Sequence, residues 1–283
     1  MTIKKIGVVG MGIMGSGIVQ VVAQSGFAVV GVELDQGRAD KAISKISGGL
    51  AKLVEKGKID AKVKDATLAN IRGTTDLAQM GECDLVIDAI TENVHNKVEL
   101  FRKLSKICRP EVVIASNTSS ISITNLASVT DRPEKVVGMH FFNPVPVMKL
   151  LEIIRARQTS DETYQTAAAV GEKLGKKMVT VQDSPGFIVN RCLIPFLNEA
   201  IYTLAEGVGT PQDIDNAIKL GLNHPMGPLE LADFVGLDTT LAVLEVFYQE
   251  FGDPKYRPCL LLKKYVEAGW LGRKSGRGFY NYS

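Results

Sequence analysis

The chain has 283 residues, more than one domain usually contains, and its 45% hydrophobic and 23% charged residues are typical of a globular enzyme. A net charge of +2, from 33 basic and 31 acidic side chains, argues against a nucleic acid or an anionic membrane as partner, and no apolar stretch reaches the ~20 residues of a membrane span. The four cysteines are scattered without metal-ligand spacing, so they predict reduced, mostly buried thiols, with no disulfide framework and no metal site.

The N-terminal residues Met1 to Lys5 lack the apolar core of a signal peptide, so we expect a cytoplasmic protein. Beyond them, short apolar segments alternate with helix-like segments, the pattern of a parallel sheet covered by helices and buried on both faces. A lysine-rich helical stretch, Lys41 to Lys64, predicts a long helical insertion after the second strand. The predicted strands are Lys5 to Gly10, Ala28 to Leu34, Asp84 to Ala89, Val112 to Ser116, Val136 to His140, Leu150 to Ile154 and Met178 to Val181.

The turn after the first strand carries the pattern GxGxxG. Gly10 permits a tight turn, Gly12 lets the backbone approach a pyrophosphate, and Gly15 allows close packing of helix on strand. The helix that follows presents free N–H groups to phosphates, and Ile13 and Met14 lie in its first turn. In this strand–turn–helix context the motif predicts a dinucleotide site.

An acidic residue, Glu33, ends the next predicted strand, where a carboxylate can hold the ribose hydroxyls. Because a carboxylate repels the extra phosphate of NADP, Glu33 favours NAD. Asp35 can share this task, and the nearby Arg38 leaves some use of NADP possible.

Ser119 follows the predicted strand Val112 to Ser116, at the carboxyl edge where open α/β sheets bind ligands. It does not lie in a GxSxG motif, so it is not interpreted as a nucleophile. Its hydroxyl is expected to hydrogen-bond a substrate oxygen or the nicotinamide.

His140 ends another predicted strand at the same edge, and Glu152 interrupts the apolar run Leu150 to Ile154. A carboxylate within an apolar strand is costly unless it is paired, and His140 is a suitable partner. Such a pair holds the imidazole in one tautomer and stabilises the imidazolium, as acid/base chemistry requires. The alternative is that Glu152 faces solvent on an edge strand.

The pattern changes at Ser184, which is expected to cap a helix with Pro185 in its first turn, and Pro195 is expected to kink that helix. Helical spacing then continues to Trp270. We therefore predict a dinucleotide-binding domain over residues 1–183 and an all-helical domain over residues 184–283. Asn190, in the first helix of the second domain, is either a polar helix residue or a contribution to the site.

Taken together, these motifs resemble the L-3-hydroxyacyl-CoA dehydrogenase family over essentially the whole chain. The resemblance implies a Rossmann-type, mostly parallel sheet with a long helical hairpin insertion, followed by an all-helical C-terminal domain that binds substrate and forms a homodimer. The resemblance rests on the segments Gly10 to Gly15, Ser116 to Ser120, Gly138 to Pro144, Asp183 to Arg191 and Leu271 to Tyr280.

The resemblance also implies roles for particular residues. The catalytic pair falls on His140 and Glu152, and the donors to the substrate oxygen fall on Ser119 and Asn190. Lysines of the helical hairpin fall on CoA-contacting positions. The implied cofactor contacts are Glu92, Lys97, Asn117, Ser119, Asn143 and Lys274, and the implied CoA contacts are Lys52, Lys56, Ser119 and Asn190.

These assignments imply hydride transfer between a 3-hydroxyacyl thioester and the nicotinamide, with an acyl-CoA as substrate. Three other interpretations remain open. The 6-phosphogluconate-like dehydrogenases share the opening glycine motif, but they place a catalytic lysine where this chain has Gly186 to Arg191. A relative that oxidises gulonate without CoA, and a structural protein like lens lambda-crystallin, also resemble this family.

Overall fold

The computed structural model describes residues 2–282 and divides the chain into two compact units, Met1–Ser184 and Pro185–Ser283. In the first unit, one sheet has the strand order β3-β2-β1-β4-β5-β6-β7-β8. Among its described strands, neighbours pair in parallel except β6 and β7, which are antiparallel to each other. Its first six strands have the order of a dinucleotide-binding sheet, so the predicted fold class is confirmed. The strands are β1 (Lys5–Val9), β2 (Ala28–Val32), β3 (Ile71–Thr74), β4 (Leu85–Asp88), β5 (Val113–Ser116), β6 (Val136–Phe141), β7 (Leu150–Arg155) and β8 (Lys177–Gln182).

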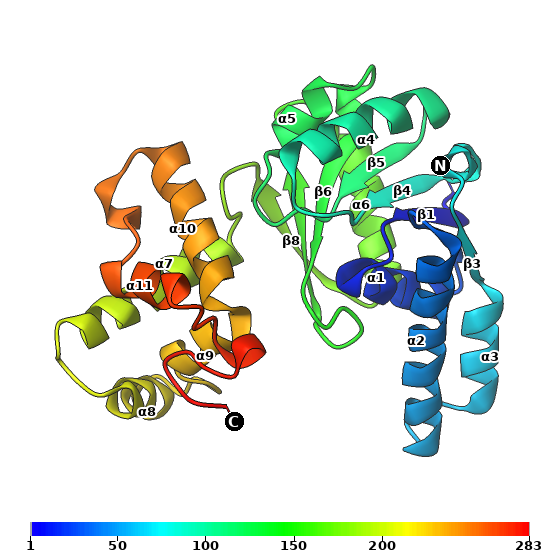
Figure 1. The fold of residues 1–283 in the computed structure, drawn as a ribbon. Coiled ribbons are helices and arrows are strands. Elements are labelled where there is room, and N and C mark those ends of the chain that lie inside the picture. Colours follow the sequence, from blue (N-terminus) through cyan, green and yellow to red (C-terminus); the bar gives the residue numbers. More distant parts are fainter. Residues whose placement is uncertain (1, 283) are drawn as a thin grey trace. The chain divides into compact units, whose positions relative to one another are not determined.

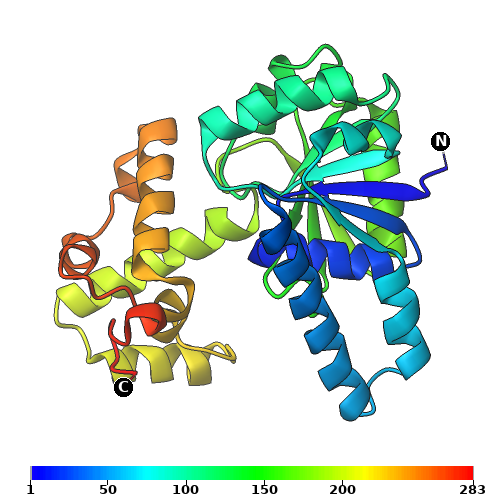
Figure 2. The same ribbon diagram turned by 45° about the vertical axis from the view of Figure 1, so that its right-hand side comes forward.

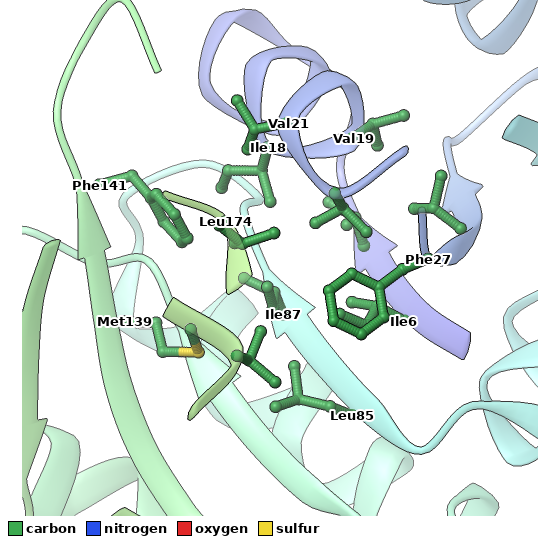
Figure 3. Close-up of a cluster of buried hydrophobic side chains, with 14 of the residues drawn as sticks. Ile6, Ile18, Val19, Val21, Phe27, Leu85, Ile87, Met139, Phe141 and Leu174 are labelled. Carbon is green, nitrogen blue, oxygen red and sulfur yellow. The ribbon is translucent and has the colours of Figure 1, made fainter. Parts of the chain in front are cut away.

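Helices cover both faces of this sheet (Figure 1). One face packs on α1 and α6. Figure 3 shows Ile18 of α1 and Leu174, just after α6, in one apolar cluster with Ile6, Ile87 and Met139 of strands β1, β4 and β6. The other face carries α4 and α5 (Figure 2). The helices of this unit are α1 (Ile13–Gln24), α2 (Gln36–Glu55), α3 (Ala61–Ala69), α4 (Val94–Ile107), α5 (Ile123–Ser128) and α6 (Asp161–Lys173).

The lysine-rich stretch is a hairpin of two helices, α2 and α3, as the family resemblance implied, and Gly57 ends the first of them with a left-handed φ of 65°. Two strands of this unit differ from the predictions. The predicted second strand stops at Val32 instead of Leu34, since the chain leaves the sheet there and Leu34 is 85% exposed. Strand β3 was not predicted, because its sequence, Ile-Arg-Gly-Thr, holds one large apolar residue.

The second unit is all-helical and comprises α7 (Val189–Ala205), α8 (Pro211–Gly221), α9 (Pro228–Val235), α10 (Leu237–Phe251) and α11 (Leu260–Glu267). Its core includes Leu197, Ile201, Leu229, Leu244 and Phe247. Two buried aspartates, Asp215 and Asp233, hold the C-terminal segment by accepting hydrogen bonds from the hydroxyls of Tyr280 and Tyr282, at 2.7 and 3.0 Å.

The predicted start of the first helix in this unit is wrong. Helix α7 begins at Val189, because Gly186 and Phe187 have left-handed φ angles of 76° and 52°, which a right-handed helix cannot contain. Ser184 and Pro185 therefore lie in the connecting segment, and Pro195 lies inside α7 as expected.

Within residues 2–282, no helix is both long enough and apolar enough to cross a membrane. The same residues contain no cluster of side chains that could hold a metal ion. Cys83, Cys108 and Cys259 are buried free thiols, and Cys192 is exposed.

Candidate active site

The antiparallel pairing of β6 with β7 places His140 directly opposite Glu152. Directly opposed residues point to the same face of a sheet, so their side chains meet. His140 Nδ1 lies 2.8 Å from Glu152 Oε2, and both side chains are buried, Glu152 completely. This burial excludes the alternative in which Glu152 faces solvent on an edge strand.

Neighbouring groups fix the orientation of the His140 ring. A carboxylate can only accept hydrogen bonds, so at 2.8 Å it requires a proton on Nδ1. The Phe142 ring packs against the imidazole, with 4.5 Å between the ring centroids. The Asn117 side-chain oxygen accepts a hydrogen bond from the Phe141 backbone N–H at 2.9 Å, which ties the end of β6 to the end of β5. The arrangement suits an imidazole that exchanges a proton through Nε2.

The glycine turn between β1 and α1 has the shape of a phosphate cradle. Gly10 has a left-handed φ of 90°, and a Cβ there would lie 2.7 Å from the Ala89 carbonyl oxygen. A Cβ on Gly15 would lie 1.8 Å from the Gly10 carbonyl oxygen, whereas one on Gly12 would meet nothing within 4 Å. Gly12 precedes α1 without a capping side chain, so the first-turn N–H groups, including those of Ile13 and Met14, can meet an anion.

Glu33 lies just beyond β2 and holds this turn. Its carboxylate accepts hydrogen bonds from the backbone N–H groups of Met11 and Leu34, at 2.8 and 3.0 Å. Asp35 instead caps α2 through the Arg38 N–H and pairs with the Arg38 guanidinium at 3.1 Å. Of the two acids, Glu33 is therefore the one placed beside the glycine turn.

A second carboxylate, Glu92, lies against the turn that follows β5. Its Oε1 accepts hydrogen bonds from Thr118, Ser119 and Ser120, three from hydroxyls and two from backbone N–H groups. Burial acts to raise the pKa of Glu92, but the hydrogen bond from Thr118 and the charge of Lys97 outweigh it and hold that pKa below its ordinary value. Ser119 is thereby fixed at the carboxyl edge of the sheet, as predicted from the sequence.

A buried ion pair lies beneath this turn. Lys97 Nζ donates to Asp88 Oδ2 at 2.7 Å and to the Ile90 carbonyl oxygen at 3.3 Å, with 1% of the lysine side chain exposed. Ser116 donates to the same Asp88 oxygen at 2.7 Å. Sequence reasoning singled out Lys97 but missed Asp88 and Ser116. The available signal for Asp88 was a carboxylate at the end of an apolar strand, much as a carboxylate inside an apolar strand pointed to Glu152.

The remaining predicted residues lie elsewhere. Asn143 is exposed in the segment after β6. Lys52 and Lys56 are exposed, one helical turn apart, toward the far end of α2 in the hairpin that projects from the sheet (Figure 2). The second unit holds Asn190 in the first turn of α7, and Lys274, whose Nζ pairs with Asp238 at 2.5 Å.

Comparison with known proteins covers both units. Residues 5–184 match the family model "3-hydroxyacyl-CoA dehydrogenase, NAD binding domain", and residues 186–282 match "3-hydroxyacyl-CoA dehydrogenase, C-terminal domain". A probable 3-hydroxybutyryl-CoA dehydrogenase of Deinococcus radiodurans is 54% identical over 98% of this chain and 100% of its own length. A 3-hydroxybutyryl-CoA dehydrogenase of Bradyrhizobium diazoefficiens is 50% identical over 99% and 96% of the two chains. The crystal structure of (S)-3-hydroxybutyryl-CoA dehydrogenase from Ralstonia eutropha superimposes with a TM-score of 0.98, at 50% identity and with both chains fully covered.

The buried ion pair yields a stability prediction. Lys97→Met leaves the Asp88 carboxylate buried without its cation, so the free energy of unfolding should fall by about 3–5 kcal/mol. Urea denaturation measures this change. Lys103→Met, at an exposed position of the same helix, is the matched control and should change stability by less than about 0.5 kcal/mol. Equal effects of the two substitutions would show that the pair does not stabilise the fold.

Proposed function

The chain belongs to the 3-hydroxyacyl-CoA dehydrogenase family of NAD-binding oxidoreductases, and on this premise we propose that it interconverts (S)-3-hydroxybutyryl-CoA and acetoacetyl-CoA. The observation that carries the four-carbon substrate is full-length similarity, at 50–54% identity, to proteins named for that activity. The His140–Glu152 pair supports the reaction type, because oxidation of an alcohol needs a group that takes the hydroxyl proton.

In the reducing direction, His140 acts as the general acid. As an imidazolium it donates the Nε2 proton to the 3-oxo oxygen and becomes neutral. Glu152 keeps the Nδ1 proton in place and stabilises the positive ring before transfer. NADH, when bound, would supply the hydride for C3 of the substrate. In the oxidising direction, neutral His140 takes the hydroxyl proton through the same nitrogen.

The cofactor would be held by the glycine turn and by Glu33. The fit rests on the open backbone at Gly12 and on the uncapped start of α1, which suit a pyrophosphate. Glu33 would accept hydrogen bonds from the ribose hydroxyls and repel a 2′-phosphate, which favours NAD over NADP. The side-chain oxygen of Asn117 accepts a hydrogen bond from the Phe141 backbone N–H. Asn117 would therefore offer its side-chain N–H groups to the cofactor. Further cofactor contacts are assigned to Glu92, Asn143 and Lys274, while buried Lys97 would act through its neighbours.

Substrate binding is assigned to Ser119, Asn190, Lys52 and Lys56. Ser119 lies at the sheet edge, where its hydroxyl can meet the substrate oxygen or the nicotinamide. Asn190 would hold the reacting oxygen through its amide. Lys52 and Lys56 are assigned to the phosphates of CoA, which their exposure and shared helix face support.

The helical unit is also proposed to form a homodimer. Its surface exposes Leu220, Leu222, Phe234 and Leu260, with 57–84% of each residue accessible. Such apolar side chains suit a subunit interface.

A steady-state assay with acetoacetyl-CoA and NADH tests the function. We expect NADH oxidation with a kcat of about 1–10³ s⁻¹, and lower kcat/KM for 3-oxoacyl-CoA substrates with longer chains. A preference for long chains would contradict the four-carbon assignment. Turnover of free hydroxyacids such as gulonate, without activity on the thioester, would contradict the acyl-CoA assignment. NADH binding without any turnover would favour the structural role.

Cofactor choice gives a separate test of Glu33. The kcat/KM with NADH should exceed that with NADPH by about 100-fold, because repulsion between like charges costs several kcal/mol. Glu33→Gln should reduce this ratio by about 10-fold, whereas Asp40→Asn, at an exposed acid on α2, should leave it unchanged. A wild-type preference for NADPH, or no change in the Glu33 variant, would refute the role given to Glu33.

A further inference from the structure

Lys176, in the turn between α6 and β8, is a buried lysine held by backbone carbonyl groups. Only 8% of the residue is exposed. Its Nζ donates hydrogen bonds to the carbonyl oxygens of Val145 at 2.5 Å and of Met148 at 2.7 Å. Burial lowers the pKa of Lys176, because the ammonium group is less well solvated there than in water. A lysine is almost never buried without partners, so these two carbonyl groups are what holds its side chain in place.

Both carbonyl groups belong to the loop that joins β6 to β7, residues 142–149, here called the β6–β7 loop. The backbone N–H groups of Val147 and Met148 donate to the Pro144 carbonyl oxygen at 2.9 and 3.0 Å, which closes the loop on itself. Val145 is its one buried residue, whereas Val147 and Met148 are 70% and 39% exposed. Since little apolar burial holds this loop, the hydrogen bonds from Lys176 supply much of its anchorage.

The buried side chain of the β6–β7 loop packs against α1. A Cβ placed on Gly17 would lie 2.9 Å from Val145 Cβ and 3.0 Å from its Cγ2, so no side chain fits between helix and loop. Gly17 lies about one helical turn after Ile13, with which α1 begins, and the N–H groups of that first turn face the proposed cofactor phosphates. The loop is therefore seated against the helix of the glycine turn and bound to Lys176.

The β6–β7 loop also carries Asn143 and continues directly from β6, which holds His140. We propose that Lys176 is a positioning residue for the nicotinamide end of the cofactor site: by binding the β6–β7 loop, it fixes Asn143 and the end of β6 relative to the glycine turn. The inference rests on the proposed function, in which the glycine turn holds the pyrophosphate and Asn143 contacts the cofactor. A dinucleotide held at its phosphates needs its reacting end aligned with His140, and a misplacement of about 1 Å can cost about 10²-fold in rate.

ADP-ribose separates the two ends of this site, because it shares the adenine, both riboses and the pyrophosphate with NADH but lacks the nicotinamide. Lys176→Met keeps the length of the side chain and removes its ammonium group. By calorimetry, this variant should bind NADH about 3- to 10-fold more weakly, the value of one hydrogen bond at the nicotinamide end. Its affinity for ADP-ribose should change by less than about 2-fold. Lys177→Met, at the adjacent exposed lysine, is the matched control and should keep both affinities.

Two outcomes in Lys176→Met would overturn the proposal. Equal weakening of NADH and ADP-ribose would show that Lys176 supports the fold as a whole and not one end of the site. Unchanged NADH binding would show that the anchorage of the loop has no effect on the cofactor.

Gly17→Ala displaces the β6–β7 loop from its other side and leaves Lys176 in place, so it decides the matter should Lys176→Met fail to fold. The three atoms nearest to the added Cβ all belong to Val145 and Pro146, so the loop has to shift. The same selective loss of NADH binding is expected. Gly48→Ala, at an exposed glycine of α2 where a Cβ would meet nothing within 4 Å, is the control. Equal losses for the two ligands in Gly17→Ala, or none, would overturn the role given to the loop.

These binding measurements need no acyl-CoA. If the protein bound NADH but failed to reduce acetoacetyl-CoA, the proposed substrate would be wrong, while the two affinities would still test Lys176. If the wild-type protein bound neither NADH nor ADP-ribose, the cofactor site would be refuted, and this proposal with it.

Discussion

A buried carboxylate costs several kcal/mol unless a hydrogen-bond donor or a cation meets it, and β7 carries one at Glu152. The reversal of direction between β6 and β7 supplies the partner, because antiparallel pairing sets His140 opposite Glu152. A parallel strand in the same place would bring its residues into a different register. The strand that departs from the parallel sheet is thus the one that assembles the candidate acid/base pair, and the geometry of His140 depends on it.

The same electrostatic requirement is met again at the end of β4. Asp88 is fully buried, and Lys97 from α4 and Ser116 from β5 both donate to it. This pair fixes the ends of two neighbouring strands and supports Glu92, which holds the turn that carries Ser119. Two buried carboxylates therefore organise the carboxyl edge of the sheet. One orients the imidazole, and the other supports Glu92 and the turn that carries Ser119.

Much of this could be predicted from the sequence, because the physical requirements are local. Gly10 and Gly15 stand where a side chain would strike the backbone, and a carboxylate inside an apolar strand demands a partner, which led from Glu152 to His140. Strand β3 could not be predicted, because it forms by pairing with β2 and not from its own apolar residues. The start of α7 was misjudged, since Ser184 and Pro185 are typical of a helix start, and the left-handed conformation of Phe187 is not visible in the residue type. The contact between Glu92 and Ser119 could not be predicted either, because it joins residues distant in the sequence.

The central claim is that His140 and Glu152 act as one catalytic unit, and kcat/KM for acetoacetyl-CoA in single and double variants tests it most directly. His140→Ala should lower kcat/KM by about 10²–10⁴-fold while NADH still binds. Glu152 acts through the imidazole, so adding Glu152→Gln to His140→Ala should change kcat/KM by less than about 3-fold, although Glu152→Gln alone should lower it substantially. If the two losses multiplied in the double variant, or if His140→Ala kept near-normal turnover, the pair would not be the catalytic unit.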